Sequence, residues 1–548
     1  MNVNIREPPP RPASSSFRRG DLSPGACGVH DAGVTREKAL IGAWGLGWAL
    51  VYLGTLTARY AFDGVAYCGE IVLALSRGSL REVVHTGHLL FSPLALLWVR
   101  LTGGLDSELA VHLRLQVLQA LLGAAAVTAL MLLLRRRVAA PVAGAVAAAF
   151  GFTYAFWRYT TDVEAYSVVA LTVIAALAAT LRAAETPTPA SATAAGLACG
   201  LATLGHLTSG LFAAVTLPLL MAWAPVRRLR VGLAFSAAYA SLVGAVLGTV
   251  ALGPAAAGRP EGRLGFLLGY MQAGSREEAF GWPWRQIPSS LATVAHALVA
   301  STPAWLVVLI APLVVGLAAG AVIATRRRSP RERRAAVVAS WWLGAHTLFY
   351  FAWECNEKYW VAALVPGALL LALACDAGLR RLAVGWRAAP AILLAAGLLA
   401  ANLPAIRHDM VPANNRVLQL ALSLRAATPP GSQVVLSGLD PWRELKVYVP
   451  YFAERTPVIL DFALAPSRRE DLAALVARIP EPDAPPTFAL GELIDTPGAR
   501  SRLEARHALP PGSLAARLRA LCLRPLHTLA GGETLYRLGG CATPPSGR

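Results

Sequence analysis

Apolar segments long enough to cross a lipid bilayer recur along most of this chain. A membrane-spanning helix needs roughly 17–25 such residues. The 548 residues are 55% hydrophobic and only 15% charged, whereas soluble domains carry about 25% charged residues. The pattern therefore predicts an all-α polytopic membrane bundle. It excludes a water-soluble globule, a disordered chain and a disulfide-rich secreted protein.

Eleven segments are predicted to be transmembrane helices, and a twelfth apolar segment is shorter. As a helix, residues 88–102 would reach only about 22 Å, less than a hydrocarbon core of about 30 Å. We therefore expect this segment to lie in the interface or to dip into the membrane. The eleven predicted spans are residues 40–58, 111–134, 138–156, 166–182, 191–206, 209–224, 231–253, 303–323, 336–352, 360–378 and 388–403.

The arginines between the spans predict the orientation. Short cytoplasmic loops are enriched in Lys and Arg. With the N-terminus inside and residues 88–102 not crossing, the clusters in 135–137, 227–230 and 326–334 all fall on the cytoplasmic side. We therefore expect a multi-pass protein of the inner (plasma) membrane whose C-terminus is extracytoplasmic. The net charge of +18 is explained by these loops, so no nucleic-acid partner is expected.

Composition divides the chain into three parts. Residues 1–38 are rich in Pro, Ser and Arg, which predicts a disordered cytoplasmic tail. Residues 39–403 form the transmembrane domain, and 404–541 predict a small extracytoplasmic α/β domain, in which Cys522 and Cys541 could pair if the compartment is oxidising. Its expected strands are 433–438, 447–452, 457–462, 487–490 and 534–538, and its expected helices are 414–427, 467–479 and 513–522.

Asp63 follows the first span directly. A carboxylate at the mouth of a bundle is costly unless it is paired or has a function. It is therefore a candidate general base or metal ligand. The alternative is an interfacial acid paired with Arg59.

Histidines mark the next part of the same outer loop. His85 and His88 end an amphipathic stretch that predicts a helix lying in the membrane interface. They would face the space above the bundle, and the alternative is an ordinary interfacial role. His206, between two predicted spans, is a weaker candidate of the same kind.

Two further outer loops carry charged residues. Asp162 and Glu164 lie two apart in 157–165, and such oxygen ligands suit Mg²⁺ or Mn²⁺. Capping of the next helix is an alternative reading that is compatible with the first. Lys358 is one of three lysines in the chain and is either a phosphate contact or an interfacial anchor. No P-loop or dinucleotide-binding glycine motif is present, so no organic cofactor is expected.

The arrangement resembles the GT-C superfamily of membrane glycosyltransferases, and most of all its protein O-mannosyltransferase-like and lipid A aminoarabinose-transferase-like members. The stretches that carry the likeness are 63–93, 156–166 and 353–360. The resemblance implies that Asp63 is the catalytic acid of the first loop and that Asp162 and Glu164 are the second-loop acids associated with a metal or the acceptor. Gly64 departs from the Asp-Glu pair of O-mannosyltransferases.

The resemblance also implies a reaction. A sugar would pass, with inversion, from a polyprenyl-phosphate donor to a hydroxyl of a protein, lipid or surface glycan, on the outer face of the membrane. A transporter or a catalytically inactive GT-C-like envelope protein would remain the alternatives. The residues expected to bind substrate around Asp63 are Arg59, His85, His88, Arg158, His206 and Lys358.

Overall fold

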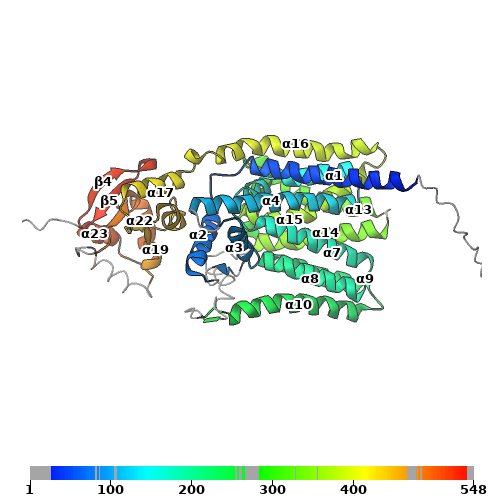
Figure 1. Ribbon diagram of the computed structural model, residues 1–548, viewed down its shortest axis with the longest axis horizontal. Coiled ribbons are helices and arrows are strands. Elements are labelled where there is room, and N and C mark those ends of the chain that lie inside the picture. The colour runs from blue at the N-terminus through cyan, green and yellow to red at the C-terminus, as the bar shows by residue number, and fades with distance from the viewer. Residues whose placement is uncertain are drawn as a thin grey trace, which may run out of the picture.

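The computed structural model describes residues 26–79, 83–85, 87–103, 108–253, 283–326, 329–353, 356–465 and 484–539, with a few isolated positions between these ranges. Most of this chain is a bundle of roughly parallel and antiparallel helices, and a small sheet domain lies at one end of it (Figure 1). The helices of the bundle are α1 (Ala26–Leu53), α4 (Glu108–Arg135), α5 (Ala140–Gly151), α6 (Tyr154–Thr160), α7 (Tyr166–Glu185), α8 (Pro189–Gly205), α9 (Gly210–Trp223), α10 (Arg228–Leu252), α12 (Pro283–Leu298), α13 (Ala304–Thr325), α14 (Pro330–Ala352), α15 (Val361–Gly378) and α16 (Val384–Asp409).

Each of the eleven predicted spans contains a helix. Within the described residues, six helices are long and apolar enough to cross a membrane, or seven if the α5–α6 pair, bent by 68°, is one span. The protein is thus a multi-pass helical bundle, while the count of eleven crossings stays a prediction. α1 begins at Ala26, so residues 26–38, which were expected in the disordered tail, are helical.

Two short helices cover the end of the bundle that faces the sheet domain, α2 (Phe62–Arg77) and α3 (Phe91–Leu101) (Figure 1). The 11 residues of α3 reach only about 16 Å at 1.5 Å per residue. This helix, which lies within the ambiguous segment 88–102, is therefore too short to cross.

The C-terminal part is an α/β domain with a five-stranded mixed sheet. The strand order is β2-β1-β3-β5-β4, in which β1 runs parallel to β2 and β3, while β5 is antiparallel to β3 and β4. Cys522 is disulfide-bonded, and Cys541, with which it could pair, lies outside the described residues. The elements are α17 (Arg416–Ala427), β1 (Gln433–Leu436), α18 (Leu445–Tyr448), η5 (Val449–Ala453), β2 (Thr456–Ile459), α19 (Leu460–Ala463), β3 (Thr487–Leu490), α21 (Gly491–Ile494), α22 (Pro497–Arg506), α23 (Ser513–Ala520), β4 (Arg524–Thr528) and β5 (Thr534–Leu538).

Several expectations about this domain need correction. The segment 447–452 was expected to be a strand but belongs to α18 and the π-helical turn η5, because its aromatic residues pack around one helical turn. Strands β1, β3 and β5 lie where they were expected, whereas β4 was not foreseen. The expected helix 467–479 lies almost entirely outside the described residues. The last span also continues to Asp409, beyond the boundary expected at residue 403.

The sheet domain and the end of the bundle share one hydrophobic core. Val65 and Ile71 of α2, Leu115 of α4 and Leu420 of α17 belong to the same buried cluster, together with strand residues such as Leu436. Hydrogen bonds cross the same junction: the hydroxyl of Tyr448 donates to the carbonyl of Tyr60 at 2.5 Å. The domain is therefore packed against α2 rather than tethered by a linker.

The arginines that predict the cytoplasmic side lie at the opposite end of the helices. Arg135, at the last turn of α4, pairs with Glu37 of α1 at 2.7 Å. Arg137 and Arg331 share the carboxylate of Glu185, at the end of α7, at 2.6 and 2.9 Å. The basic loops and the sheet domain thus lie at opposite ends of the bundle, as the predicted orientation requires.

Candidate active site

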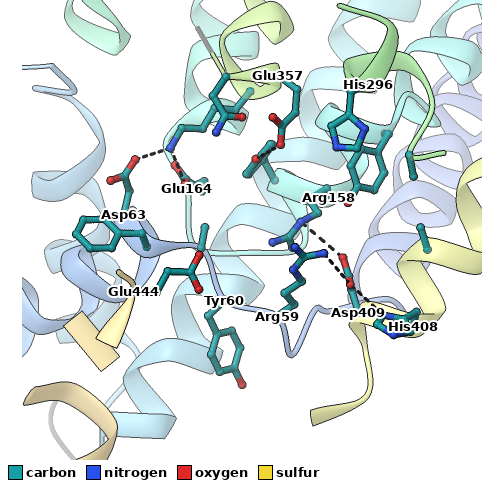
Figure 2. Close-up of a pocket in the computed structure, with 18 of the residues that line it drawn as sticks. Arg59, Tyr60, Asp63, Arg158, Glu164, His296, Glu357, His408, Asp409 and Glu444 are labelled. Carbon is teal, nitrogen blue, oxygen red and sulfur yellow. Dashed lines mark hydrogen bonds and ion pairs between the residues drawn. The ribbon is translucent and has the colours of Figure 1, made fainter. Parts of the chain in front are cut away.

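A polar cavity of about 510 Å³ opens where the bundle, α2 and the sheet domain meet (Figure 2). Its walls come from the loop between α1 and α2, from the first turn of α2, from α6 and the loop after it, from the ends of α12 and α16, from the 3-10 turn η3 (Glu357–Trp360), and from the residue preceding α18. Its lining includes many charged side chains for a cavity of this size. These are Arg59, Asp63, Arg158, Glu164, Glu357, Lys358, Asp409 and Glu444, with His296 and His408.

Lys358 joins two carboxylates on one side of the cavity. It lies in the 3-10 turn η3 (Glu357–Trp360) and donates to the Oδ2 of Asp63 and, at 3.1 Å, to the Oε1 of Glu164. Figure 2 shows Asp63 and Glu164 turned toward each other across these ion pairs. The side chain of Lys358 is 11% exposed and that of Glu164 is fully buried, whereas 40% of the side chain of Asp63 is exposed. Of the three groups, Asp63 is the one that a substrate can reach.

The pKa values of Asp63 and Glu164 are shifted in opposite directions. Burial raises the pKa of Asp63, but the Lys358 ammonium and then the nearby His88 and His85 outweigh it, and the pKa of the carboxyl is lowered. Burial raises the pKa of Glu164 to about 8, although Lys358 opposes it. Asp63 is therefore ionised at neutral pH, and Glu164 holds a proton more readily than an ordinary carboxyl group.

Asp162 has a structural role. Its Oδ2 accepts the backbone N–H of Ala61 at 2.8 Å and its Oδ1 accepts that of Val163 at 2.8 Å. The side chain is fully buried, and Arg158 and His112 each approach it to 3.8 Å. This carboxylate fixes the loop before α2 to the loop between α6 and α7, and so positions Asp63.

The predicted divalent-cation pair of Asp162 and Glu164 does not fit this arrangement. The oxygens of Asp162 already accept two backbone hydrogen bonds, and Glu164 faces an ammonium group. Within the described part of the chain, no group of three or more His, Cys, Asp or Glu side chains is placed to hold a metal ion.

The two arginines expected to bind substrate differ in their surroundings. The Nε of Arg158 lies 3.6 Å from Asp409, its side chain is 8% exposed, and its Nη1 donates to the hydroxyl of Thr57 at 3.4 Å. Arg59 also faces Asp409, at 3.6 Å, but 60% of its side chain is exposed. Both arginines point toward this carboxylate (Figure 2). Arg158 is thus part of a buried structural network, and Arg59 remains accessible from the cavity.

Gly64, the departure from the O-mannosyltransferase pattern, has a packing reason. A Cβ at this position would lie 2.3 Å from the carbonyl oxygen of Val163, a distance that no side chain tolerates. The first turn of α2 is pressed against the loop that carries Glu164. Glycine at position 64 therefore permits the close approach that brings Asp63 and Glu164 to one lysine.

The three histidines lie together behind Asp63 and are absent from the described lining of the cavity. The rings of His88 and His206 are 4.7 Å apart, and those of His85 and His88 are 5.6 Å apart. Burial lowers the pKa of His88 to about 3. Of the predicted site residues, Arg59, Asp63, Arg158, Glu164 and Lys358 thus line the cavity, whereas the three histidines lie behind its described wall.

Several lining residues were not singled out from the sequence. Asp409 ends the last long helix, Glu357 accepts the hydroxyl of Tyr159 at 2.6 Å, and Glu444 comes from the sheet domain. Glu357 could have been found, because it neighbours Lys358 in a charged outer loop. Asp409 and Glu444 lie in parts of the sequence where nothing but the tertiary fold indicates the site.

An apolar cavity of about 270 Å³ lies within the bundle next to the polar one. Consecutive stretches of chain line both. Thr153, Leu298 and Trp360 face the apolar cavity, while Tyr154 and Lys358 face the polar one. An amphiphilic molecule with a charged head and an apolar tail would match this pair of neighbouring spaces.

No protein-family model and no curated protein matches the sequence significantly, whereas solved structures match most of its fold. ArnT from Cupriavidus metallidurans, bound to undecaprenyl phosphate, is 14% identical with a TM-score of 0.58, over 92% of this chain and 98% of its own. An oligosaccharyltransferase from Archaeoglobus fulgidus, in complex with Zn and sulfate, is 14% identical with a TM-score of 0.52, over 90% and 73%. AglB from the same archaeon, with an inhibitory peptide and a dolichol-phosphate, is 13% identical with a TM-score of 0.50, over 93% and 75%. These proteins are GT-C superfamily members, and the chain has their fold.

Proposed function

We propose that this protein is an integral-membrane glycosyltransferase that moves a sugar from a polyprenyl-phosphate donor to an acceptor hydroxyl. The observation that carries the proposal is the pairing of Asp63 and Lys358 in a polar cavity beside an apolar one. An accessible carboxylate can take a proton from a hydroxyl, and an adjacent cation can stabilise a departing phosphate. Both groups occur where a lipid-linked substrate can enter from the membrane.

The donor would occupy both cavities. Its prenyl chain would lie against Leu298 and Trp360 in the apolar cavity, and its phosphate would be near Lys358 and the exposed guanidinium of Arg59. The fold supports this choice of donor class, since ArnT of the same fold was crystallised with undecaprenyl phosphate. Arg158 would act indirectly, by holding Asp409 and the floor of the site.

The chemistry follows from these positions. Asp63 accepts the proton of the acceptor hydroxyl as its oxygen forms a bond to the anomeric carbon of the sugar. The bond from that carbon to the phosphate oxygen breaks at the same time, and the electron pair leaves with the polyprenyl phosphate. Attack opposite to the leaving group inverts the anomeric centre. Lys358 and Arg59 stabilise the charge on the departing phosphate.

The position of the cavity favours an enzyme over a transporter. Transporters place substrate groups near the bilayer midplane, often at broken helices. Here the charged cavity lies at the end of the bundle, under the sheet domain and opposite to the basic loops. On the predicted orientation this end is the outer face of the inner membrane. The acceptor would be a protein, lipid or surface glycan that reaches the cavity from that side.

Turnover of lipid-linked sugars tests the proposal. The purified protein is reconstituted in liposomes and given polyprenyl-phosphate sugars with candidate acceptors, and the release of polyprenyl phosphate is measured. We expect release by the wild type and loss of at least about 100-fold in Asp63→Asn, a typical contribution of a general base, at unchanged expression. Asp440→Asn, a change at an exposed aspartate outside the described lining of the cavity, is the matched control. Retained activity in Asp63→Asn would remove Asp63 as the base, and a well-folded wild type that turns over no donor would favour a transporter or an inactive relative.

A further inference from the structure

We infer that the ammonium of Lys358 takes the place of a divalent cation between Asp63 and Glu164, so that this site excludes metal ions and works without one. The part of the inference that concerns turnover rests on the proposed function. The part that concerns exclusion of metal ions rests on the geometry of the three side chains alone.

The first argument is position. Two carboxylates from different elements, Asp63 of α2 and Glu164 of the loop before α7, converge on one point, as the ligands of a hard cation do. The atom found at that point is the Nζ of Lys358, which bonds to one oxygen of each carboxylate. An ammonium group and a metal ion compete for the same oxygens, and the lysine is attached to the protein.

The second argument is that Lys358 is held in place. Lys358 as a whole is 8% exposed. Its Nζ lies 6.0 Å from the ring centre of Tyr159 and 5.8 Å from that of Tyr166. A cation over an aromatic face is stabilised by the ring quadrupole. The lysine is therefore confined by two carboxylates and two rings, and a divalent cation would have to enter beside a positive charge within contact distance.

The third argument is the lack of spare ligands. Asp162, two residues before Glu164, already accepts two backbone N–H groups, and Glu357, beside Lys358 in the cavity lining, accepts the hydroxyl of Tyr159. One oxygen of Glu164, Oε2, has no hydrogen-bond partner and is buried. A metal ion with Asp63 and Glu164 would have to take most of its six or more oxygen ligands from water in the cavity. It would gain no further protein ligand to compensate for displacing the tethered ammonium.

This arrangement gives Lys358 a second property. An ammonium group has three N–H donors, and the two carboxylates accept two of them. The third can donate to a phosphate oxygen of the donor in the cavity. One residue would then keep Asp63 ionised and contact the leaving group, which are two tasks that a metal ion performs in other transferases.

Binding of Mn²⁺, followed by electron paramagnetic resonance, tests the inference without any assay of activity. Chelator-treated, purified full-length protein is titrated with MnCl₂, and the loss of the free-ion signal reports binding. We expect no stoichiometric binding by the wild type. We expect Lys358→Met, which leaves Asp63 and Glu164 without their shared ammonium group, to bind Mn²⁺ at least about tenfold more tightly, because a like charge in contact with the ion is gone. Lys446→Met, a lysine of the sheet domain that lies over the ring of Phe462, should behave as the wild type.

Two further variants decide whether the ion binds where we infer. The double variant Lys358→Met, Asp63→Asn should lose the Mn²⁺ binding gained by Lys358→Met, and Lys358→Arg, which keeps the charge, should not gain it. Stoichiometric Mn²⁺ binding by the wild type that disappears in Glu164→Gln would overturn the inference. So would a folded Lys358→Met protein that binds no Mn²⁺. If Lys358→Met does not fold, the wild-type titration and Lys358→Arg still decide.

Turnover provides the second readout. If the wild type transfers sugar, we expect the same rate in EDTA as in Mg²⁺ or Mn²⁺, and a rate that collapses in EDTA would overturn the inference. If no donor is turned over, the proposed function fails, while the Mn²⁺ titrations still decide whether Lys358 occupies the place of a cation.

Discussion

Replacing Asp162 by Asn distinguishes a structural carboxylate from a metal ligand. The change keeps the shape of the side chain but leaves one oxygen to serve two backbone donors, those of Ala61 and Val163 at 2.8 Å each. A hydrogen bond to a charged group contributes about 1.5–3 kcal/mol, and a buried N–H left unpaired costs about 1–3 kcal/mol. Arg158 and Asp409 would also lose part of their charge balance. We therefore expect Asp162→Asn to lower the free energy of unfolding by roughly 3–5 kcal/mol, which is the range for breaking a buried ion pair.

Thermal unfolding in detergent, followed by tryptophan fluorescence or by loss of the monodisperse peak, measures this loss. With an unfolding entropy of about 2.1 cal/mol/K per residue, a chain of 548 residues shifts by about 1 °C per kcal/mol. The expected fall in Tm is therefore roughly 3–5 °C, the same with and without Mn²⁺. Asp440→Asn, at an exposed position, should leave the Tm unchanged. The reasoning would be refuted by an Asp162→Asn protein as stable as the wild type whose activity is lost and then restored by Mn²⁺, because that result would make Asp162 a metal ligand.

Three further experiments test other parts of the site. Gly64→Ala places a Cβ 2.3 Å from the carbonyl oxygen of Val163, so it should displace α2, lower the Tm and abolish transfer. Gly78→Ala, at the far end of α2, is the comparison that shows how much of the loss in Tm comes from replacing any glycine at an end of this helix. Arg59→Met should leave the Tm unchanged and raise the KM for the donor, whereas Arg158→Met should lower the Tm by several degrees, since Arg158 is buried among carboxylates. Burial lowers the pKa of His88 from 6.5 to about 3. Between pH 6.5 and pH 3 the unfolded chain therefore takes up a proton that the folded chain does not, and the free energy of unfolding falls as the pH falls. His88→Gln should flatten this dependence of Tm on pH.

Much of the fold follows from local sequence. Long apolar segments bounded by arginines predict helices because a bilayer leaves the backbone no other partner than itself, and each of the eleven segments contains a helix. The strands 487–490 and 534–538 were predicted to the residue, as short apolar runs between turn residues. The segment 447–452 was misjudged because its Val, Tyr and Phe residues suggested a strand, although Pro450 within it disfavours one. These residues form a helical turn that packs in the same buried cluster as α2.

The site could be predicted in part, for the same reason. Asp63 and Lys358 are unusual at their positions. Asp63 is a carboxylate at the mouth of a predicted span. Lys358 is one of only three lysines in the chain and lies on the predicted outer side, where lysine is disfavoured. Such local anomalies are visible in the sequence. The role of Asp162 was not, because its partners are backbone N–H groups, which every residue except proline carries and which no residue pattern marks. Glu444 was missed because it lies about 380 positions from Asp63 along the chain and reaches the cavity only through the docked sheet domain.

The sheet domain is therefore part of the candidate active site and is not a separate appendage. It shares a hydrophobic core with α2, and the hydroxyl of Tyr448 donates to the carbonyl of Tyr60, three residues before Asp63. Asn415, at the start of α17, donates to the carbonyl of Ala58 in the same loop. A shift of the domain would pull on the loop that carries Asp63 and would also move Glu444 in the cavity wall. On the proposed function, an acceptor that binds the sheet domain would have a short mechanical route to Asp63, and a protein in which the domain is cut away should lose the position of Asp63 as well as the wall it removes.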